Sequence, residues 1–440
     1  MLYKDTIQSG WGRALRSKAR IARPERRTAL DELMSTAPAP AFGAARSYGD
    51  AALNADGALI DMSRLNRLLR FTPETGCLRA EAGVTLGELL AIFGPQGWMP
   101  AAMPGTAHVT LGGAIASDVH GKNHHAHGSF GQHVSSIRLM GADGKLRDIS
   151  EVEHPELFRA TIGGMGQTGV IVAAELRLIR CAGGRVELRK QRLPNLDAFL
   201  AAFHDNSADF SVGWIDATAK GTALGRGVLE EGHVIAGNFA SPRNPRAVPF
   251  NMPGLTLSRP AVKAFNALYY HRASARGRMR KRPIGDMFFP LDGLAHWNRL
   301  YGKRGFHQFQ CVLPQSTCEV MLPRLLEEIA GSGLASPLSV LKKLGSGRAG
   351  YMSFPMAGMT LAADFRSKAK AVPLLAKLNR MVAEAGGRVY MAKDSTLDPG
   401  LIRAMYPEVD KYRAVLAEVD PTGVFTTDLA RRLNLRGTDA

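Results

Sequence analysis

The chain has 440 residues, with 56 Lys and Arg against 39 Asp and Glu, which gives a formal net charge of +17. At about 150 residues per domain, this length predicts two or three domains. A hydrophobic content of 45% excludes global disorder, and the 47 glycines follow no Gly-X-Y period, which excludes collagen. The four cysteines form no C-x-x-C pair. That pattern argues against a disulfide scaffold and a cysteine zinc site, and it fits a reducing compartment.

The termini and the longest uncharged run bear on localisation. The N-terminal residues are basic but lack an apolar run, so no secretory signal is expected. The uncharged run 89–117 is long enough to span a bilayer, but it contains Pro95, Pro100 and Pro104, which would leave backbone groups unsatisfied in lipid. We therefore expect a cytoplasmic protein that is at most peripheral at the inner face of the membrane.

The first part of the chain, to about residue 182, alternates strands and helices joined by glycine-rich loops. The predicted strands are 39–46, 58–62, 77–84 and 170–179, with a hairpin over 135–149 that turns at Asp143-Gly144. The predicted helices are 24–35, 85–94 with Thr85 as N-cap, and 154–163.

The pattern changes between residues 183 and 387. Strands are predicted at 185–193, 210–217, 232–239, 306–314 and 359–365, and a helix at 320–333. The stretch 241–285 is rich in proline and arginine and contains no acidic residue. Towards the C-terminus, 426–435 resembles a basic helix.

A formal G-x-G-x-x-G occurs at Gly164–Gly169. A dinucleotide-binding fingerprint needs a strand before it and a helix after it, so that phosphate meets a helix N-terminus. Here a predicted helix precedes the motif and the β-branched strand 170–179 follows it. The sequence therefore argues against a Rossmann domain.

Two other segments are candidates for phosphate cradles. Gly43–Gly49 offers consecutive amides, a hydroxyl and an arginine in one turn. Pro104–Thr106 together with Thr110–Ala114 offers small residues through which a flat ligand could touch backbone. Each segment alone is equally well an ordinary tight loop, but two in one domain favour ligand binding.

The segment Asp118–Gly128 contains four histidines. Their spacing matches no usual zinc motif, so a metal site is the weaker alternative. We expect His124, His125 and His127 to face solvent. His120 and Lys122 lie beside the glycine-rich run and suit donors aimed at a bound anion.

The basic stretch 241–285 has three interpretations. Nucleic-acid binding is disfavoured because aromatic residues are sparse and no nucleic-acid motif accompanies them. A solvated loop is the simplest interpretation. A mobile lid that meets anionic lipid headgroups is the sharper alternative.

An ordered set of motifs along nearly the whole chain carries a family resemblance. The segments are ARSYGDAALNADGALIDMSRLN, PGTAHVTLGGAIASDVHGKNHHAHGSFG, ELFRATIGGMGQTGVI, FPLDGLAHWNRLYGKRGFHQFQ, RVYMAKDS, MYPEVD and DPTGVFTTDLARRL. They resemble FAD enzymes of the vanillyl-alcohol-oxidase (PCMH) type, and within them the oxidases of decaprenylphosphoryl ribose. The resemblance implies an α+β fold of two domains. These are an FAD-binding domain from residues 1–182 and 388–440, and a substrate domain with an antiparallel sheet from 183–387 that carries the mobile segment 241–285.

No metal is expected in this site, because the histidine spacing matches no usual zinc motif. The residues expected along FAD are Gly43, Ala44, Ala45, Arg46, Ser47, Tyr48, Gly49, Gly105, Thr106, Thr110, Gly112, Gly113, Ala114, Gly121, Asn123, Gly128, Ile171 and Tyr390. Those expected on the substrate side are Tyr48, Gln308, Gln310, Lys342 and Thr360, with Lys393 and His120 as catalytic groups. For Lys393, a neutral base and a charged group that orients the hydroxyl remain alternatives.

Four departures from the family pattern affect this site. Ala45 stands where glycine is usual, which still permits amide contacts if its φ is negative. Arg46 stands where covalent relatives carry the flavin-linked histidine, so FAD is expected to be non-covalent. Thr360 replaces an asparagine, and Ala362 replaces a cysteine that some members carry beside the flavin.

The expected activity is FAD-dependent oxidation of the ribose 2′-hydroxyl of a polyprenylphosphoryl-β-D-ribose, the first half of epimerisation to an arabinofuranose donor. A short-chain dehydrogenase would reduce the keto product, and a quinone or O2 would take the electrons. One rival is an aldonolactone or alditol oxidase that uses O2. The other is a non-catalytic basic protein that binds nucleic acid or membrane.

Overall fold

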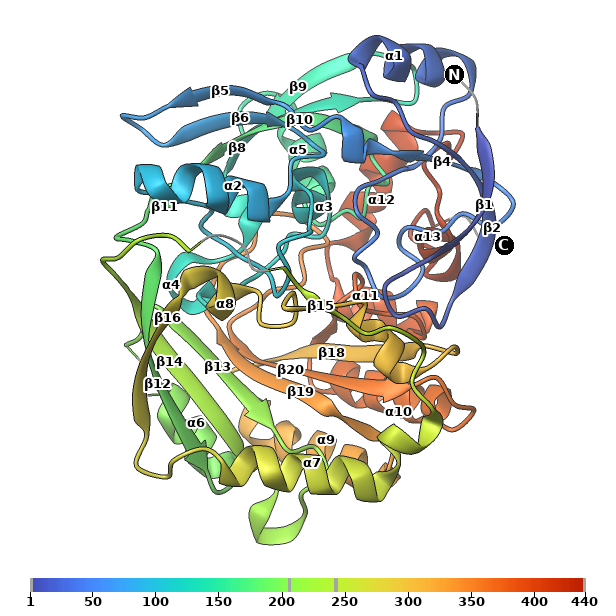
Figure 1. Cartoon of the computed structure of the whole chain (residues 1–440). Helices are drawn as coiled ribbons and strands as arrows, with labels where there is room; N and C mark the ends of the chain where they lie inside the picture. The colour runs from blue at the N-terminus through green and yellow to red at the C-terminus, as the bar shows by residue number, and fades with distance from the viewer. Residues whose placement is uncertain (1–2, 205–206, 241–243, 438–440) are drawn as a thin grey trace.

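The computed structural model describes residues 3–204, 207–240 and 244–437. Two sheets form most of the first part, at the top of Figure 1. A four-stranded sheet has the order β1 (Lys4–Ser9), β2 (Arg16–Ala22), β4 (Ala58–Asp61), β3 (Ala41–Phe42). A five-stranded antiparallel sheet has the order β5 (Leu68–Thr72), β6 (Cys77–Glu81), β10 (Val170–Arg177), β8 (Val134–Met140), β9 (Leu146–Ser150). The short pair β7 (Trp98–Met99) and β11 (Ile179–Arg180) lies at their margin.

Five helices accompany these sheets. They are α1 (Arg27–Thr36), α2 (Leu86–Phe93), α3 (Leu111–Ala116), α4 (His124–His127) and α5 (Pro155–Thr161). Thr85 caps α2 through a capping box with Glu88, as the sequence predicts. The Gly164–Gly169 motif lies between α5 and strand β10, so the rejection of a Rossmann motif is confirmed.

The second part is built on one eight-stranded antiparallel sheet. Its order is β16 (Arg278–Pro283), β12 (Arg185–Leu193), β14 (Gly227–Ile235), β13 (Phe210–Ile215), β19 (Ala335–Leu344), β20 (Gly358–Arg366), β18 (Phe306–Pro314), β21 (Arg388–Val389). The helices of this part are α6 (Leu196–His204), α7 (Arg259–His271), α8 (Ile284–Phe288), α9 (Cys318–Ser332) and α10 (Ala371–Glu384). A short parallel pair joins β15 (Arg246–Ala247) to β17 (Leu294–Ala295).

The C-terminal tail returns to the first part. Helices α11 (Ile402–Met405), α12 (Val409–Val419) and α13 (Asp428–Arg432) lie beside N-terminal elements in Figure 1. Tyr412 on α12 donates its hydroxyl to the carbonyl of Gly164 at 2.7 Å. The expected domain limits stay a prediction. The pair Arg388–Val389, which was expected in the FAD-binding domain, pairs with β18 in the eight-stranded sheet of the second part.

Two local expectations need correction. The predicted strand 39–46 extends only over Ala41–Phe42, because residues 43–48 form a loop. The stretch 241–285, for which a solvated loop was the simplest interpretation, contains helix α7 and sheet strand β16, while 241–243 lies outside the described residues. Its role as a mobile lid stays a prediction.

Candidate active site

A cavity of about 1080 Å³ lies between the glycine loops of the first part and the eight-stranded sheet. Most of the residues predicted for the cofactor line it, namely Gly43, Ala44, Ala45, Arg46, Ser47, Tyr48, Gly105, Thr106, Thr110, Gly112, Gly113, Gly121, Ile171 and Tyr390. From the predicted substrate side and catalytic groups it is lined by His120, Gln308, Gln310, Lys342 and Lys393. The fold thus brings together residues that are up to about 350 positions apart.

Five predicted residues, namely Gly49, Ala114, Asn123, Gly128 and Thr360, are not among those that line the cavity. Gly49 packs so closely that a Cβ there would lie 1.7 Å from the carbonyl oxygen of Asp394. Asn123 Nδ2 donates to the Ala101 carbonyl at 2.6 Å. These two positions therefore support the cavity wall.

Lys393 lies on the loop after β21, with its Nζ 3.5 Å from the centre of the Tyr48 ring. The Tyr48 amide donates to the carbonyl of Ala392 at 2.9 Å, which fixes the two loops together. Burial lowers the pKa of Lys393 to about 7, since the charge of Lys342 adds to the effect of desolvation while Asp364 opposes it. About half of the Lys393 amines are therefore neutral at pH 7.

Asp364 on β20 is fully buried and interacts electrostatically with Lys393. Its two oxygens accept from Gln308 Nε2 at 2.5 Å and from the Tyr301 hydroxyl at 2.9 Å. Burial raises the pKa of this carboxyl to about 7, although the two hydrogen bonds and Lys393 lower it. Asp364 was not predicted. The sequence holds a signal for it, because Thr360, Ala362 and Asp364 are every second residue of β20 and therefore lie on one face of the strand.

His120 is 6% exposed and contacts Gln310 through its Nε2, 2.9 Å from Gln310 Nε2. Its pKa is held well below the usual value by burial and by the charge of Lys342, so the ring is neutral. The Nδ1 atom is buried without a hydrogen-bond partner. A neutral ring with a free polar atom at the cavity can hold a ligand hydroxyl.

Lys342 on β19 and Lys122 before α4 add two further cations on the substrate side. Burial lowers the pKa of each to about 8, and the charge of Lys122 contributes to the shift of Lys342. Lys122 Nζ also donates to the carbonyl of Met287. With Lys393, three lysines and one neutral histidine line one cavity, which suits a polar ligand that carries an anion.

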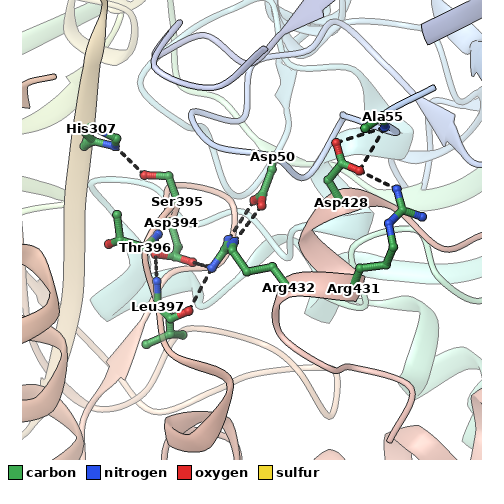
Figure 2. A network of polar contacts seen from close by, with 10 residues as sticks. All are labelled: Asp50, Ala55, His307, Asp394, Ser395, Thr396, Leu397, Asp428, Arg431 and Arg432. Atoms are coloured by element: carbon green, nitrogen blue, oxygen red, sulfur yellow. Dashed lines mark hydrogen bonds and ion pairs between the residues drawn. The ribbon is translucent and has the colours of Figure 1, made fainter. Parts of the chain in front are cut away.

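Helix α13 ties the loop of Tyr48 to the loop of Lys393 (Figure 2). Arg432 donates to both carboxylate oxygens of Asp50 at 2.7 and 2.8 Å and forms an ion pair with Asp394 at 2.8 Å. Asp394 in turn accepts from the amides of Thr396 and Leu397, each at 2.9 Å. A C-terminal arginine therefore holds the residue next to Lys393 in place.

The glycine loops leave room for a ligand against backbone. At Gly105 nothing lies within 4 Å of where a Cβ would stand, and at Gly113 only Thr110 Oγ1 does, at 3.1 Å. Arg46 Nε is buried without a hydrogen-bond partner, and its guanidinium lies 4.4 Å from the centre of the Trp11 ring. This set offers space against the backbone and one unmatched cationic donor, as a phosphate-bearing ligand requires.

Ala45 departs from its expected conformation. Its φ is +48°, in the left-handed region that glycine adopts without strain. The expectation that Ala45 still permits amide contacts depended on a negative φ, and its positive φ does not meet that condition. The alanine is held in this region at a cost of about 1–2 kcal/mol.

The expectation that His124 faces solvent is wrong, because this residue is only 1% exposed. Its Nδ1 accepts a hydrogen bond from the Gly345 amide at 3.1 Å. His125 is half-buried, with Nε2 2.8 Å from the carbonyl of Ala208. His127 is half-buried too, and its carbonyl contacts His133. The segment forms helix α4 against β19, so its histidines pack at a contact between the two parts. In the described part of the chain, no group of three or more His, Cys, Asp or Glu side chains is arranged to hold a metal ion.

Comparison with known proteins gives the class of this cavity. The family described as "FAD binding domain" matches residues 20–150, and the family described as "D-arabinono-1,4-lactone oxidase" matches residues 359–433. D-arabinono-1,4-lactone oxidase of Yarrowia lipolytica is 29% identical over 31% of this chain and 26% of that protein. L-gulonolactone oxidase of Mus musculus is 31% identical over 28% of each chain. The fold and the site are those of an FAD-dependent oxidoreductase of the two-domain α+β PCMH type.

A longer match narrows the class. Decaprenylphosphoryl-beta-D-ribose oxidase of Mycolicibacterium smegmatis is 36% identical over 413 residues, covering 90% of this chain and 89% of that protein. The chain belongs to the decaprenylphosphoryl-β-D-ribose oxidase family. This result confirms the resemblance inferred from the motifs and removes the non-catalytic rival.

The residues present fit FAD. The open backbone at Gly105 and Gly113 and the unmatched Arg46 donor suit its pyrophosphate. Tyr390, stacked on Phe354 with ring centres 4.6 Å apart, offers an aromatic wall where the first part meets the sheet. Among the described residues, no helix is both long and apolar enough to cross a membrane.

Proposed function

We propose that the protein oxidises the 2′-hydroxyl of a polyprenylphosphoryl-β-D-ribose to the 2′-keto sugar, as the first half of epimerisation to an arabinofuranose donor. The observation that carries this proposal is the cluster of Lys393, Lys342 and Lys122 in one cavity with neutral His120. A sugar phosphate presents an alcohol to Lys393 and an anion to Lys342 and Lys122.

FAD, when bound without a covalent link, accepts the hydride that leaves the sugar carbon. The chain's own residues do the rest. Lys393 in its neutral form accepts the hydroxyl proton, so the C–O single bond becomes a carbonyl as the C–H bond breaks. Gln310 and His120 hold the sugar hydroxyls, and Gln308 is fixed by Asp364. These contacts set the position of the reacting C–H bond.

The remaining parts of the proposal concern the reaction cycle. A quinone or O2 reoxidises the flavin, and a short-chain dehydrogenase reduces the keto sugar with inversion at the carbon. The lipid-linked substrate places the enzyme at a membrane surface.

The test uses the purified FAD enzyme and polyprenylphosphoryl-β-D-ribose under anaerobic conditions. The expected result is bleached flavin and a product lighter by two hydrogens, which borodeuteride labels at one carbon of the ribose. Bleaching without a ketone at the 2′ position, or no bleaching with a flavin-saturated enzyme, overturns the proposal.

A second candidate is an aldonolactone oxidase that uses O2, favoured by the matched family over residues 359–433. An aldonolactone is neutral, so it offers no anion to the charges of Lys342 and Lys122. Rapid peroxide formation with a soluble aldonolactone, and no bleaching by the lipid-linked ribose, would establish this alternative.

A further inference from the structure

Helix α7 and the short turn before it expose apolar side chains to solvent. Phe265 and Leu268 on α7 are 50% and 60% exposed, and Leu255 in the turn Gly254–Leu257 is 79% exposed. The side of α7 that carries Val262 and Asn266 is anchored, since Val262 is buried and Asn266 Nδ2 donates to Asp216 at 2.7 Å. Phe265 lies at the edge of that side and Leu268 points away from it. A helix that is buried on one side normally presents polar residues on the other. An apolar outer face therefore points to a contact with something apolar.

The chain around this face is strongly basic. Residues 241–285 contain ten Lys and Arg and no Asp or Glu. The exposed members in the described range are Arg246, Arg259, Lys263, Arg272, Arg276, Arg278, Arg280 and Lys281. On α7 itself, Arg272 lies on the side of Phe265 and Leu268, because it follows them by seven and four residues, whereas Lys263 projects from the far side of the helix. This combination of a cationic border and an apolar face is typical of helices that lie in the plane of an anionic membrane surface.

The same helix lines the cavity of the active site. Ala261, Val262, Phe265 and Tyr269 are among the lining residues. Because Phe265 is half exposed as well, α7 stands where the cavity meets solvent. Figure 1 shows α7 along the lower side of the molecule, away from β1 and α1. The cavity wall near it is largely apolar, formed by Leu257, Trp214 and Val340. An apolar chain attached to a ligand in the cavity would leave beside α7.

We propose that the α7 face, defined as Leu255, Phe265, Leu268 and Arg272, docks on an anionic phospholipid bilayer and takes the lipid chain of the substrate from it. The inference rests on the proposed function for the substrate, but the docking itself does not. The apolar side chains enter the boundary between headgroups and acyl chains, and the cations pair with lipid phosphates. The substrate's sugar phosphate then reaches the lysines through the opening beside Phe265.

Binding is measured with the FAD-loaded full chain by flotation with vesicles of phosphatidylcholine containing 30% phosphatidylglycerol, and with pure phosphatidylcholine. Wild type is expected to partition at least about tenfold better to the anionic vesicles. The double variant Leu255→Gln/Leu268→Gln should lose about tenfold or more, and Arg272→Gln about fivefold. None of these three residues lines the cavity, so flavin content and melting temperature are expected to stay unchanged.

Matched controls alter equally exposed residues elsewhere. Val152→Gln/Val320→Gln removes two apolar side chains that are 94% and 66% exposed. Lys145→Gln/Lys411→Gln removes two exposed charges on the other part of the molecule. Both control pairs should bind vesicles as wild type does. Equal loss in controls and α7-face variants would overturn the proposal, as would vesicle binding that none of the variants changes.

A second measurement separates docking from catalysis. Turnover of long-chain polyprenylphosphoryl ribose in anionic vesicles should fall with the α7-face variants, while turnover of a short-chain, water-soluble version should not. Equal loss on both substrates overturns the role of the face in lipid delivery. If no lipid-linked ribose is oxidised while vesicle binding follows the variants as expected, the proposed function fails and the docking surface stands.

Discussion

The amine of Lys393 sets a testable pH dependence. An ordinary lysine with a pKa of 10.5 is neutral in only about 1 molecule in 3,000 at pH 7, whereas a pKa of about 7 makes half of the Lys393 amines neutral. If the neutral amine takes the hydroxyl proton, the rate of flavin reduction should rise about tenfold per pH unit below 7 and level off above it. His120 adds no inflection there, because burial keeps its pKa far below this range.

The assay is anaerobic single-turnover bleaching of the flavin between pH 5.5 and 9, for wild type and Lys393→Met. The variant should keep its flavin but lose about 10²–10⁴ in rate, with no inflection near pH 7. Asp364→Asn is the matched control, because it removes the other group that titrates near pH 7 and a charge that raises the pKa of Lys393. Its inflection should move to lower pH. A rate that falls as the pH rises through 7, or a Lys393→Met profile parallel to wild type, refutes the reasoning.

The other predictions concern stability and positioning. The lowered pKa of Lys393 costs stability at every pH below 7, and the cost fades as the pH approaches 10.5. Lys393→Met should therefore melt higher than wild type at pH 7, with a gap that closes by pH 10, and a gap independent of pH contradicts this linkage. Arg432→Met leaves buried Asp50 and Asp394 unpaired and should cost about 3 kcal/mol in urea unfolding. In the folded variant kcat should fall more than KM rises, because the arginine acts through the Lys393 loop, and an unchanged kcat removes that positioning role. Ala45→Gly relieves left-handed strain, so its melting temperature should hold or rise, and a fall of several degrees shows that the alanine methyl contributes contacts.

Local chemistry made much of the fold predictable. The Thr85 capping box, the Asp143-Gly144 hairpin and the β-branched run 170–179 each specify their element within a few residues, and the structure contains them. Of the loop at residues 43–48, the sequence predicts 43–46 as strand, because small apolar residues there resemble a buried strand. Its conformation is set by contacts far along the chain, such as the bond from the Tyr48 amide to Ala392.

The same difference between local sequence signals and long-range contacts holds at the site. The resemblance carried by the segment RVYMAKDS points to Lys393, and the glycine loops stand out because of their residue types. Asp364 and Arg432 do not, since a lone carboxylate in a strand and a basic residue in a C-terminal helix are common. Their importance arises from burial and from partners up to 382 positions away, as for Arg432 and Asp50. Similarly, His124 was expected in solvent because its burial against β19 depends on tertiary packing.

The most direct test of the central claim is anaerobic mixing of the FAD enzyme with polyprenylphosphoryl-β-D-ribose, read by the loss of flavin absorbance and by product mass. The account predicts full bleaching and a 2′-keto product lighter by two hydrogens, both abolished in Lys393→Met with its flavin retained. Bleaching by a soluble aldonolactone but not by the lipid-linked ribose would contradict it.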